Sequence, residues 1–226
     1  MKIVLTNDDG IDAPGLEALR KVLETVGEVI IVAPEHGQSG ISHRVTMREP
    51  IIMKELGRNR FMVSGTPADC TRLALKKIAP DADIVFSGIN FGANLGTDVY
   101  VSGTVAAARE AAFMGKRAVA MSQYIGEGKK PMWDVTSRSA LKLLDFILGM
   151  DLSHGTFLNI NLPFQEDHEI PEPRFCDPDT TPYKLDFMEK DGAFILCDVI
   201  HYRPRKPGFD IDVCFSGYAS VSKIRI

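Results

Sequence analysis

Two acidic residues stand side by side near the start of the chain, in the segment Asn7-Asp8-Asp9-Gly10. They directly follow an apolar run at residues 2–6, which is typical of a strand buried on both faces of a parallel sheet. Side chains of an extended strand alternate between its faces, so Asp8 and Asp9 can converge only in a turn, which Gly10 permits. Two converging carboxylates share a proton or bind a hard divalent cation. The alternative is that one Asp caps the next helix and the other is solvated.

Three neutral side chains follow other predicted strands and could complete a cation site. Ser39 lies in the loop segment EHGQSG, and Asn90 and Asn94 lie in the Gly/Asn-rich segment SGINFGANLGTD. Open parallel sheets bind ligands at the carboxyl ends of their strands, where these segments are expected to meet the paired acids. The combined donor set is rich in oxygen and suits Mg²⁺ or Mn²⁺ better than Zn²⁺.

A second group with chemical potential is Ser102-Gly103-Thr104, at the predicted start of a helix. The N–H groups and dipole of a helix N-terminus attract anions, Gly103 allows close approach, and two hydroxyls add donors, so the turn could hold a phosphate. The alternative is an ordinary Ser/Thr helix cap. His43, in the Gly/Ser-rich loop at residues 35–45, is a candidate phosphate contact or base, or is simply solvated.

The elements that must position these residues alternate between strands and helices. A strand, a helix and a strand at this pitch form a βαβ unit, whose right-handed crossover makes the first two strands parallel neighbours. Asp12 is expected to cap the first helix, and Thr66 and Asp69 form a capping box for a later one. The sequence therefore predicts an α/β fold, a mostly parallel sheet flanked by helices, over residues 1–162. The expected strands are 2–6, 28–34, 82–86, 117–122 and 156–163, with a hairpin of 50–54 and 60–64.

The C-terminal part differs in character, and we interpret residues 163–226 as a β-rich extension. It is rich in proline and acids and contains three β-like runs, at 192–200, 210–215 and 218–224. These strands are too few to bury themselves as an isolated hairpin, so they must contact the α/β body or another subunit. We expect a homodimer or tetramer.

Composition excludes several other classes of protein. The 226 residues carry a net charge of −4 without a Lys/Arg-rich block, which argues against nucleic acid as a partner. The chain contains neither a run of 18 apolar residues nor a signal-peptide pattern, so a membrane location is not expected. Its four cysteines form no CxxC pair and are expected to be buried thiols, as in a cytoplasmic protein.

Five motifs together resemble one known family. TNDDGIDAPG, VAPEHGQSG, GTPADC, SGINFGANLGTDVYVSGTVAAA and FLNINLP occur in this order over about residues 1–163. They are similar to the SurE family of metal-dependent nucleoside-monophosphate phosphatases. The resemblance implies a Rossmann-like fold and one divalent metal ion held by Asp8, Asp9, Ser39 and Asn90. It also implies hydrolysis of 5′- or 3′-nucleotides, some activity on short polyphosphate, and a substrate side formed by Asn94 and Ser102–Thr104.

Two features depart from the family pattern. The loop segment EHGQSG lacks the basic residue that commonly precedes the metal-binding serine, so phosphate affinity or substrate choice could differ. The sequence also stops a few residues after SVSK, whereas many relatives have a longer tail. Because the C-terminal arm of the family often exchanges between subunits, the oligomer does not simply carry over.

The favoured function is a phosphomonoesterase in which either Asp8 or Asp9 is the base. A phospho-receiver domain also pairs acids after its first strand, but it needs a phospho-accepting Asp at a later strand end, where this chain has FSGIN. A nucleotide-sugar transferase using Mn²⁺ is not excluded by the acids alone. Phosphate release from AMP or GMP without an acceptor sugar distinguishes these functions.

Overall fold

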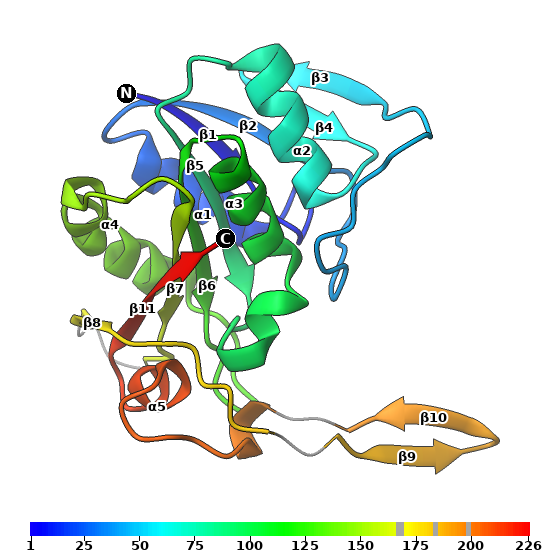
Figure 1. The fold of residues 1–226 in the computed structure, drawn as a ribbon, viewed down its shortest axis with the longest axis vertical. Coiled ribbons are helices and arrows are strands. Elements are labelled where there is room, and N and C mark those ends of the chain that lie inside the picture. The colour runs from blue at the N-terminus through cyan, green and yellow to red at the C-terminus, as the bar shows by residue number, and fades with distance from the viewer. Residues whose placement is uncertain (166–169, 183–184, 198–199) are drawn as a thin grey trace.

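The structure, a computed structural model, describes residues 1–165, 170–182, 185–197 and 200–226. Its largest feature is one nine-stranded sheet with the order β3-β4-β2-β1-β5-β6-β7-β11-β8 (Figure 1). The strands from β4 to β7 are parallel, whereas β3 and β11 run antiparallel to their neighbours β4 and β7. In the order of the sheet the strands are Met53–Gly57, Arg60–Val63, Glu28–Pro34, Lys2–Thr6, Ile84–Phe91, Arg117–Gln123, Thr156–Leu162, Ala219–Arg225 and Pro173–Phe175.

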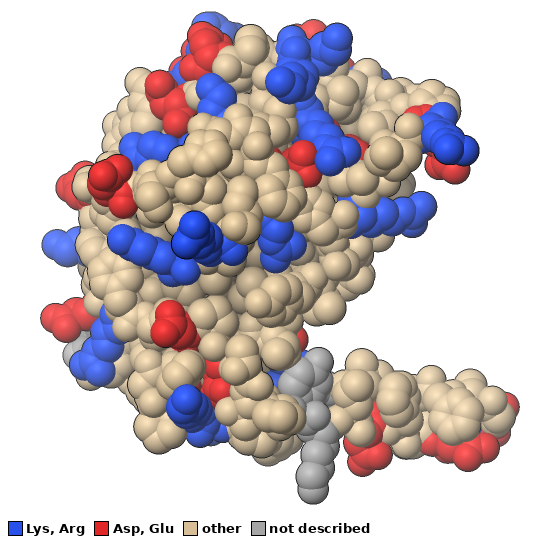
Figure 2. Space-filling view, in the orientation of Figure 1, with Lys and Arg blue, Asp and Glu red and all other residues tan. Residues whose placement is uncertain are grey.

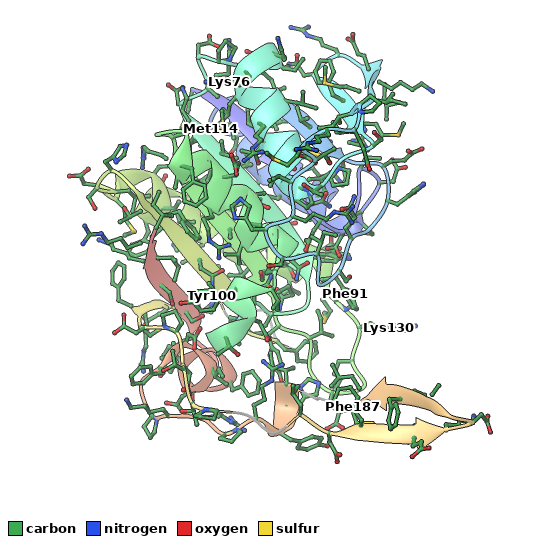
Figure 3. All side chains as sticks on the ribbon, turned by 45° about the vertical axis from the view of Figure 1, so that its right-hand side comes forward. Lys76, Phe91, Tyr100, Met114, Lys130 and Phe187 are labelled. Atoms are coloured by element: carbon green, nitrogen blue, oxygen red, sulfur yellow. The ribbon has the colours of Figure 1, made fainter. Side chains whose placement is uncertain are left out.

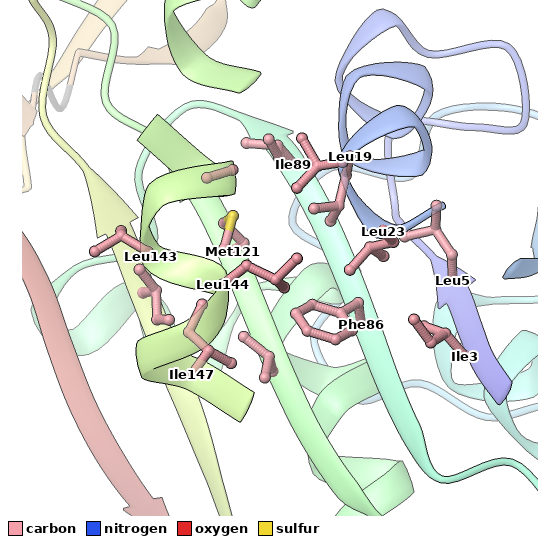
Figure 4. Packing of buried hydrophobic residues seen from close by; sticks show 14 of the residues in the cluster. Ile3, Leu5, Leu19, Leu23, Phe86, Ile89, Met121, Leu143, Leu144 and Ile147 are labelled. Atoms are coloured by element: carbon pink, nitrogen blue, oxygen red, sulfur yellow. The ribbon is translucent and has the colours of Figure 1, made fainter. Parts of the chain in front are cut away.

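Helices cover both faces of this sheet. The helices α1 (Pro14–Leu23) and α4 (Trp133–Gly149) pack on one face, and α2 (Pro67–Leu73) and α3 (Gly103–Phe113) pack on the other. Side chains of β1 alternate between the two cores, because Ile3 and Leu5 join the first and Val4 joins the second. Figure 4 shows the first core, where the ring of Phe86 lies between residues of α1 and α4. The predicted Rossmann-like α/β fold is thereby confirmed.

Local predictions for the first half of the chain are mostly confirmed. β1 and β2 are parallel neighbours, and the expected hairpin is present as β3 and β4. The capping box of α2 is complete, since Thr66 Oγ1 accepts from Asp69 N and Asp69 Oδ2 accepts from Thr66 N. A π-helical turn (Ala74–Ile78) then continues α2.

Two predictions in this half are wrong. Asp12 does not cap α1: the N-cap position belongs to Ala13, and Asp12 instead accepts a hydrogen bond from Arg60 Nη2 at 3.1 Å. The fifth strand does not end at Phe86 but continues to Phe91, because Asn90 and Phe91 still pair with Ser122 and Gln123 of β6. The neighbouring strand therefore overrides the low β propensity of Gly88 and Asn90.

The C-terminal residues form three different structures. The run at 210–215 is a helix, α5 (Asp210–Phe215), rather than a strand; six residues are too few to separate the two periodicities. The run at 218–224 is β11, inside the main sheet and paired with β7. The run at 192–200 contributes β10 (Ala193–Leu196), which pairs with β9 (Phe187–Lys190) in a projecting hairpin (Figure 1), while its residues 198 and 199 lie outside the described residues.

Of the β-rich extension expected over residues 163–226, only the hairpin of β9 and β10 is separate from the body, because β8 and β11 belong to the main sheet and α5 is a helix. The division of the chain at residue 162 stays a prediction. The expectation of buried thiols holds for Cys70 and Cys214, whereas Cys197 is exposed. In the described ranges no helix is both long and apolar enough to cross a membrane.

Candidate active site

The paired carboxylates lie in a turn fixed by its own polar groups. Asn7 Nδ2 donates to the carbonyl of Gly10 at 2.9 Å, and Ile11 N donates to the carbonyl of Pro34, at the end of β2, at 2.8 Å. Gly10 has a φ of +104°, which a residue with a side chain rarely adopts. The turn therefore leaves β1 and binds to the end of β2 before α1 begins.

Asp8 faces the start of α3. Its Oδ1 accepts a hydrogen bond from the Thr104 hydroxyl, and the residue is only 6% exposed. Gly103 makes this approach possible, because a Cβ at that position would lie 2.9 Å from Asp8 Cβ. The first turn of α3 therefore packs directly against the carboxylate, whereas the close approach of a phosphate to Gly103 stays a prediction.

Asp9 faces the end of β5 instead. Its Oδ2 accepts from the backbone N–H of Phe91 at 2.9 Å, which places the preceding residue, Asn90, beside the acidic turn. Asn90 Nδ2 donates to the carbonyl of Gly92 at 2.7 Å, so Oδ1 is the atom of this amide left for a cation. Gly88 lets β5 take this course, since a Cβ there would lie 2.1 Å from the carbonyl oxygen of Met121.

Asp8 is buried and Asp9 is half-buried, and no cationic side chain among the described residues balances them. The pKa of Asp8 is raised to about 6, mainly by burial; the hydrogen bond from the Thr104 hydroxyl lowers this pKa, and the charge of Asp9 raises it. Burial also raises the pKa of Asp9, and the Phe91 N–H opposes that effect. Within the described ranges neither acid forms an ion pair with Lys, Arg or His. Such a pair fits a divalent cation, whose charge would compensate both.

Gln38 ties the loop after β2 to this turn. Its backbone N–H donates to the carbonyl of Asp8 at 2.7 Å, and its Nε2 donates to the carbonyl of Gly65 at 2.9 Å. Ser39, the predicted neutral ligand, is the next residue and is exposed. The role of Ser39 as a ligand stays a prediction, and sequence reasoning missed Gln38, whose backbone attaches this loop to the acidic turn.

The two hydroxyls at the start of α3 have different partners. Ser102 Oγ accepts from Val105 N at 3.1 Å as the helix N-cap, which leaves its own proton to donate elsewhere. Thr104 donates its only hydroxyl proton to Asp8. The Thr104 N–H also bonds to Asp8, so the hydroxyl of Ser102 and the N–H of Gly103 are the donors that a phosphate could use.

Asn94 belongs to a buried amide network. Its N–H donates to Asn161 Oδ1 at 2.7 Å, and its carbonyl accepts from Asn159 Nδ2 at 2.9 Å and Asn161 Nδ2 at 3.1 Å. Its own Nδ2 donates to Ser122 Oγ at 2.8 Å. The two asparagines of β7 thus hold the loop after β5, a role that sequence reasoning missed although their spacing places both on one face of that strand.

His43 is not brought to the carboxylates. Its Nε2 lies 2.8 Å from Glu110 Oε2, its Nδ1 lies 3.4 Å from Arg109 Nη1, and its ring stacks on Phe113. Glu110 is buried and also accepts from Arg72 Nε at 2.7 Å. These contacts attach the loop at residues 35–45 to the second half of α3, away from Ser102 and Gly103 at its start.

The C-terminal part supports the same edge of the sheet from a distance in sequence. Asp210, fully buried at the start of α5, accepts from Gly96 N at 2.7 Å and from Asp179 N at 2.8 Å. Arg203 pairs with Asp98 at 2.7 Å. Gly96 and Asp98 lie in the 3₁₀ turn η2 (Gly96–Tyr100), which leads into Ser102. Sequence reasoning found none of these contacts.

The fold and these residues define a Rossmann-like α/β protein with an acidic, oxygen-rich edge beside a helix N-terminus. A sequence model of the family described as "Survival protein SurE" matches residues 3–184. A Synechocystis protein whose name gives it provisionally as a 5′-nucleotidase is 43% identical over the whole length of both chains. The 5′-nucleotidase SurE of Allorhizobium ampelinum is 39% identical over all of this chain and 92% of its own.

The same relationship is visible in the fold. The crystal structure of the SurE protein from Aquifex aeolicus superimposes with a TM-score of 0.88 at 30% identity, covering all of this chain and 93% of that one. The chain belongs to the SurE family.

Proposed function

We propose that this protein is a 5′-nucleotidase that depends on a divalent metal ion and releases phosphate from nucleoside 5′-monophosphates. The observation that carries the proposal is a pair of carboxylates without a cationic partner: Asp8 is buried against the N-terminus of α3, and Asp9, half-buried beside it, faces the end of β5. The names of the curated relatives supply the class of substrate.

The oxygen atoms of Asp8, Asp9, Ser39 and Asn90 would hold one Mg²⁺ or Mn²⁺ ion. When bound, such an ion supplies Lewis-acid stabilisation of phosphoryl charge and lowers the pKa of a water molecule. The hydrogen bond from Thr104 orients Asp8, and the Phe91 N–H orients Asp9. Each acid keeps one oxygen outside these hydrogen bonds, and either is a candidate for the general base.

The start of α3 would bind the phosphoryl group. Ser102 Oγ–H and the N–H group of Gly103 donate toward the developing negative charge, and the helix dipole has the favourable sign. Asn94 lies on the substrate side of this edge, where its backbone is held by Asn159 and Asn161. The contacts of His43 favour a role in holding its loop on α3 over direct contact with phosphate.

Two further activities belong to the proposal. The groups assigned here bind a phosphoryl group and a cation. None of them distinguishes a phosphate ester on the 5′-hydroxyl of the ribose from one on the 3′-hydroxyl. We therefore include nucleoside 3′-monophosphates and short polyphosphate as secondary substrates. The four free cysteines fit a reducing compartment such as the cytoplasm.

Assembly forms the last part of the proposal. The hairpin of β9 and β10 projects from the body with exposed Phe187, Met188, Phe194, Ile195 and Leu196 (Figure 2). An isolated two-stranded hairpin is marginally stable in water. We propose that a second copy of the chain covers it, in a homodimer or a tetramer built from such dimers.

Hydrolysis of AMP tests the central proposal. The purified protein should release inorganic phosphate from AMP with Mg²⁺ or Mn²⁺ and no acceptor sugar, lose this activity on exhaustive chelation, and regain it when metal is restored. Asp9→Asn should abolish turnover at saturating metal while the protein stays folded. Undiminished turnover after chelation would refute metal dependence, and the absence of phosphate release from any nucleoside monophosphate would refute the function.

A further inference from the structure

The last residue of β5 is an exposed aromatic ring beside the carboxylates. Phe91 is 56% exposed, although the first six residues of the same strand are buried. Its own N–H donates to Asp9 Oδ2 at 2.9 Å, so the ring branches from the residue that touches the acidic turn (Figure 3). In the part of the chain that the structure describes, this ring has no aromatic or cationic partner and joins none of the hydrophobic clusters.

The backbone that carries this ring is held on both sides. Besides the bond to Asp9, the N–H of Gly92 donates to the carbonyl of Gln123 at 3.0 Å, and the carbonyl of Gly92 accepts from Asn90 Nδ2 at 2.7 Å. The ring is therefore presented from a fixed support. A ligand that stacks on it loses little of its binding free energy to ordering of the protein.

A second exposed ring stands near the other proposed binding group. Tyr100, the last residue of η2, is 66% exposed and precedes Ser102 by two residues. Its carbonyl accepts from Ser42 Oγ at 2.9 Å. The segments that carry the proposed metal ligand Asn90 and the proposed phosphate donor Ser102 thus each present an aromatic ring to solvent (Figure 3).

We propose that Phe91 is the stacking surface for the base of a nucleotide substrate, an inference that rests on the function proposed above. In a nucleoside 5′-monophosphate only the ribose separates the base from the phosphate, so a base next to a phosphate held by Ser102 lies near the acidic turn. Stacking on an aromatic side chain tolerates every base, because each has a π face. The site therefore selects nucleotides over base-free phosphomonoesters without selecting among bases.

Two observations favour Phe91 over Tyr100 and a base over a protein partner. The side chain of Phe91 has no polar atom that could hydrogen-bond to water, so its exposure has no such compensation. The hydroxyl of Tyr100 can hydrogen-bond to water when the ring is exposed. A macromolecule packed on Phe91 would also cover Asp9, which the residue contacts through its backbone, and would obstruct the proposed active site.

The first test compares two substrates that differ only in the base. With Mn²⁺ present, kcat/KM is measured for AMP and for ribose 5-phosphate in the wild type, Phe91→Ala, Phe91→Trp and Tyr100→Ala. The ratio of the two values should fall about 10- to 100-fold in Phe91→Ala and be retained in Phe91→Trp, as expected for loss and replacement of one stacking surface. Tyr100→Ala is the matched control, since it removes an equally exposed ring from the other segment.

The outcomes separate this inference from the proposed function. A wild type that hydrolyses neither substrate refutes the function. A wild type that hydrolyses both equally, an unchanged ratio in Phe91→Ala, or a fall confined to Tyr100→Ala leaves the function standing and refutes the role of Phe91. A change of oligomeric mass in Phe91→Ala, measured by sedimentation, would assign the ring to a subunit contact instead.

A binding measurement gives a readout other than activity. In Phe91→Trp without added metal, AMP should quench tryptophan fluorescence and ribose 5-phosphate should not. The chain's single natural tryptophan, Trp133, packs against Gly15, so the wild type gives the background signal. Equal quenching by both compounds, or quenching by neither, would contradict stacking.

Discussion

Substitution of Ser102 separates a helix cap from a phosphate donor, because this residue has the geometry for both. Its Oγ accepts from Val105 N at 3.1 Å, and the residue is buried at the start of α3. Loss of such a cap costs about 1 kcal/mol when Ala replaces Ser, but only a few tenths when Gly does. For a chain of this size, about 1 kcal/mol lowers Tm by roughly 2–4 °C.

The second role has a different magnitude. If Ser102 Oγ–H also donates to the phosphoryl group as charge develops, its loss should lower kcat by about two to three orders of magnitude. We expect Ser102→Ala to show both effects, and Ser102→Gly to show the fall in kcat with a smaller fall in Tm. Both variants lack the hydroxyl, so both should lose the donor to phosphate. Only Ser102→Ala should also destabilise the helix, because Gly is tolerated at the N-cap position and Ala is not.

The assay is phosphate release from AMP at saturating metal, run beside thermal unfolding of the same preparations. Wild-type kcat in both variants, together with a lower Tm in Ser102→Ala alone, would refute the phosphate role and leave Ser102 as a helix cap. A fall in kcat that follows Tm across the two variants, so that Gly is nearly as active as the wild type, would refute it equally.

Three further perturbations follow from the contacts of the site and the arm. Thr104→Val removes the hydrogen bond from the hydroxyl to Asp8. Loss of a group that orients a metal ligand typically weakens metal binding about 10- to 100-fold, and we expect this for Mn²⁺ here. An unchanged Mn²⁺ affinity in a titration would show that Asp8 does not need this hydrogen bond. Asp210→Ala leaves the N–H groups of Gly96 and Asp179 without their acceptor, so the free energy of unfolding should fall by about 3 kcal/mol in urea titrations, and a loss below about 1 kcal/mol would contradict this account. The wild type should sediment as a dimer or tetramer at micromolar concentration and Phe194→Asp as a smaller species; a monomeric wild type would rule out the proposed assembly.

The sequence predicted those parts of the fold and site that depend on neighbours in the chain. The apolar run before Asp8 indicates a buried strand, Gly10 indicates the turn, and Thr66 with Asp69 spells out a capping box; each needs only a few adjacent residues. The short polar and apolar runs near the C-terminus lack such signals. A six-residue run with Ile211 and Val213 two apart matches a strand as well as a helix, and its neighbours in space decide between them.

His43 shows that a loop near the acidic turn can place one of its side chains elsewhere. The loop at residues 35–45 does reach the acidic turn, but through the backbone of Gln38. His43 instead contacts a buried glutamate, Glu110, 67 positions further along the chain. A pairing between a loop and the far end of a helix leaves no periodic pattern in a single sequence, so the residue type alone suggested chemistry.

Contacts between distant parts of the chain also explain why C-terminal residues support the proposed phosphate site although no sequence motif indicates it. η2 has no long helix of its own to fix it, and its Gly96 and Asp98 are held by Asp210 and Arg203, more than 100 positions later. Gly96 accommodates this contact because a Cβ there would lie 2.6 Å from the carbonyl oxygen of Asp179. The start of α3 is therefore placed jointly by β5, which precedes η2, and by the segment that follows the projecting hairpin.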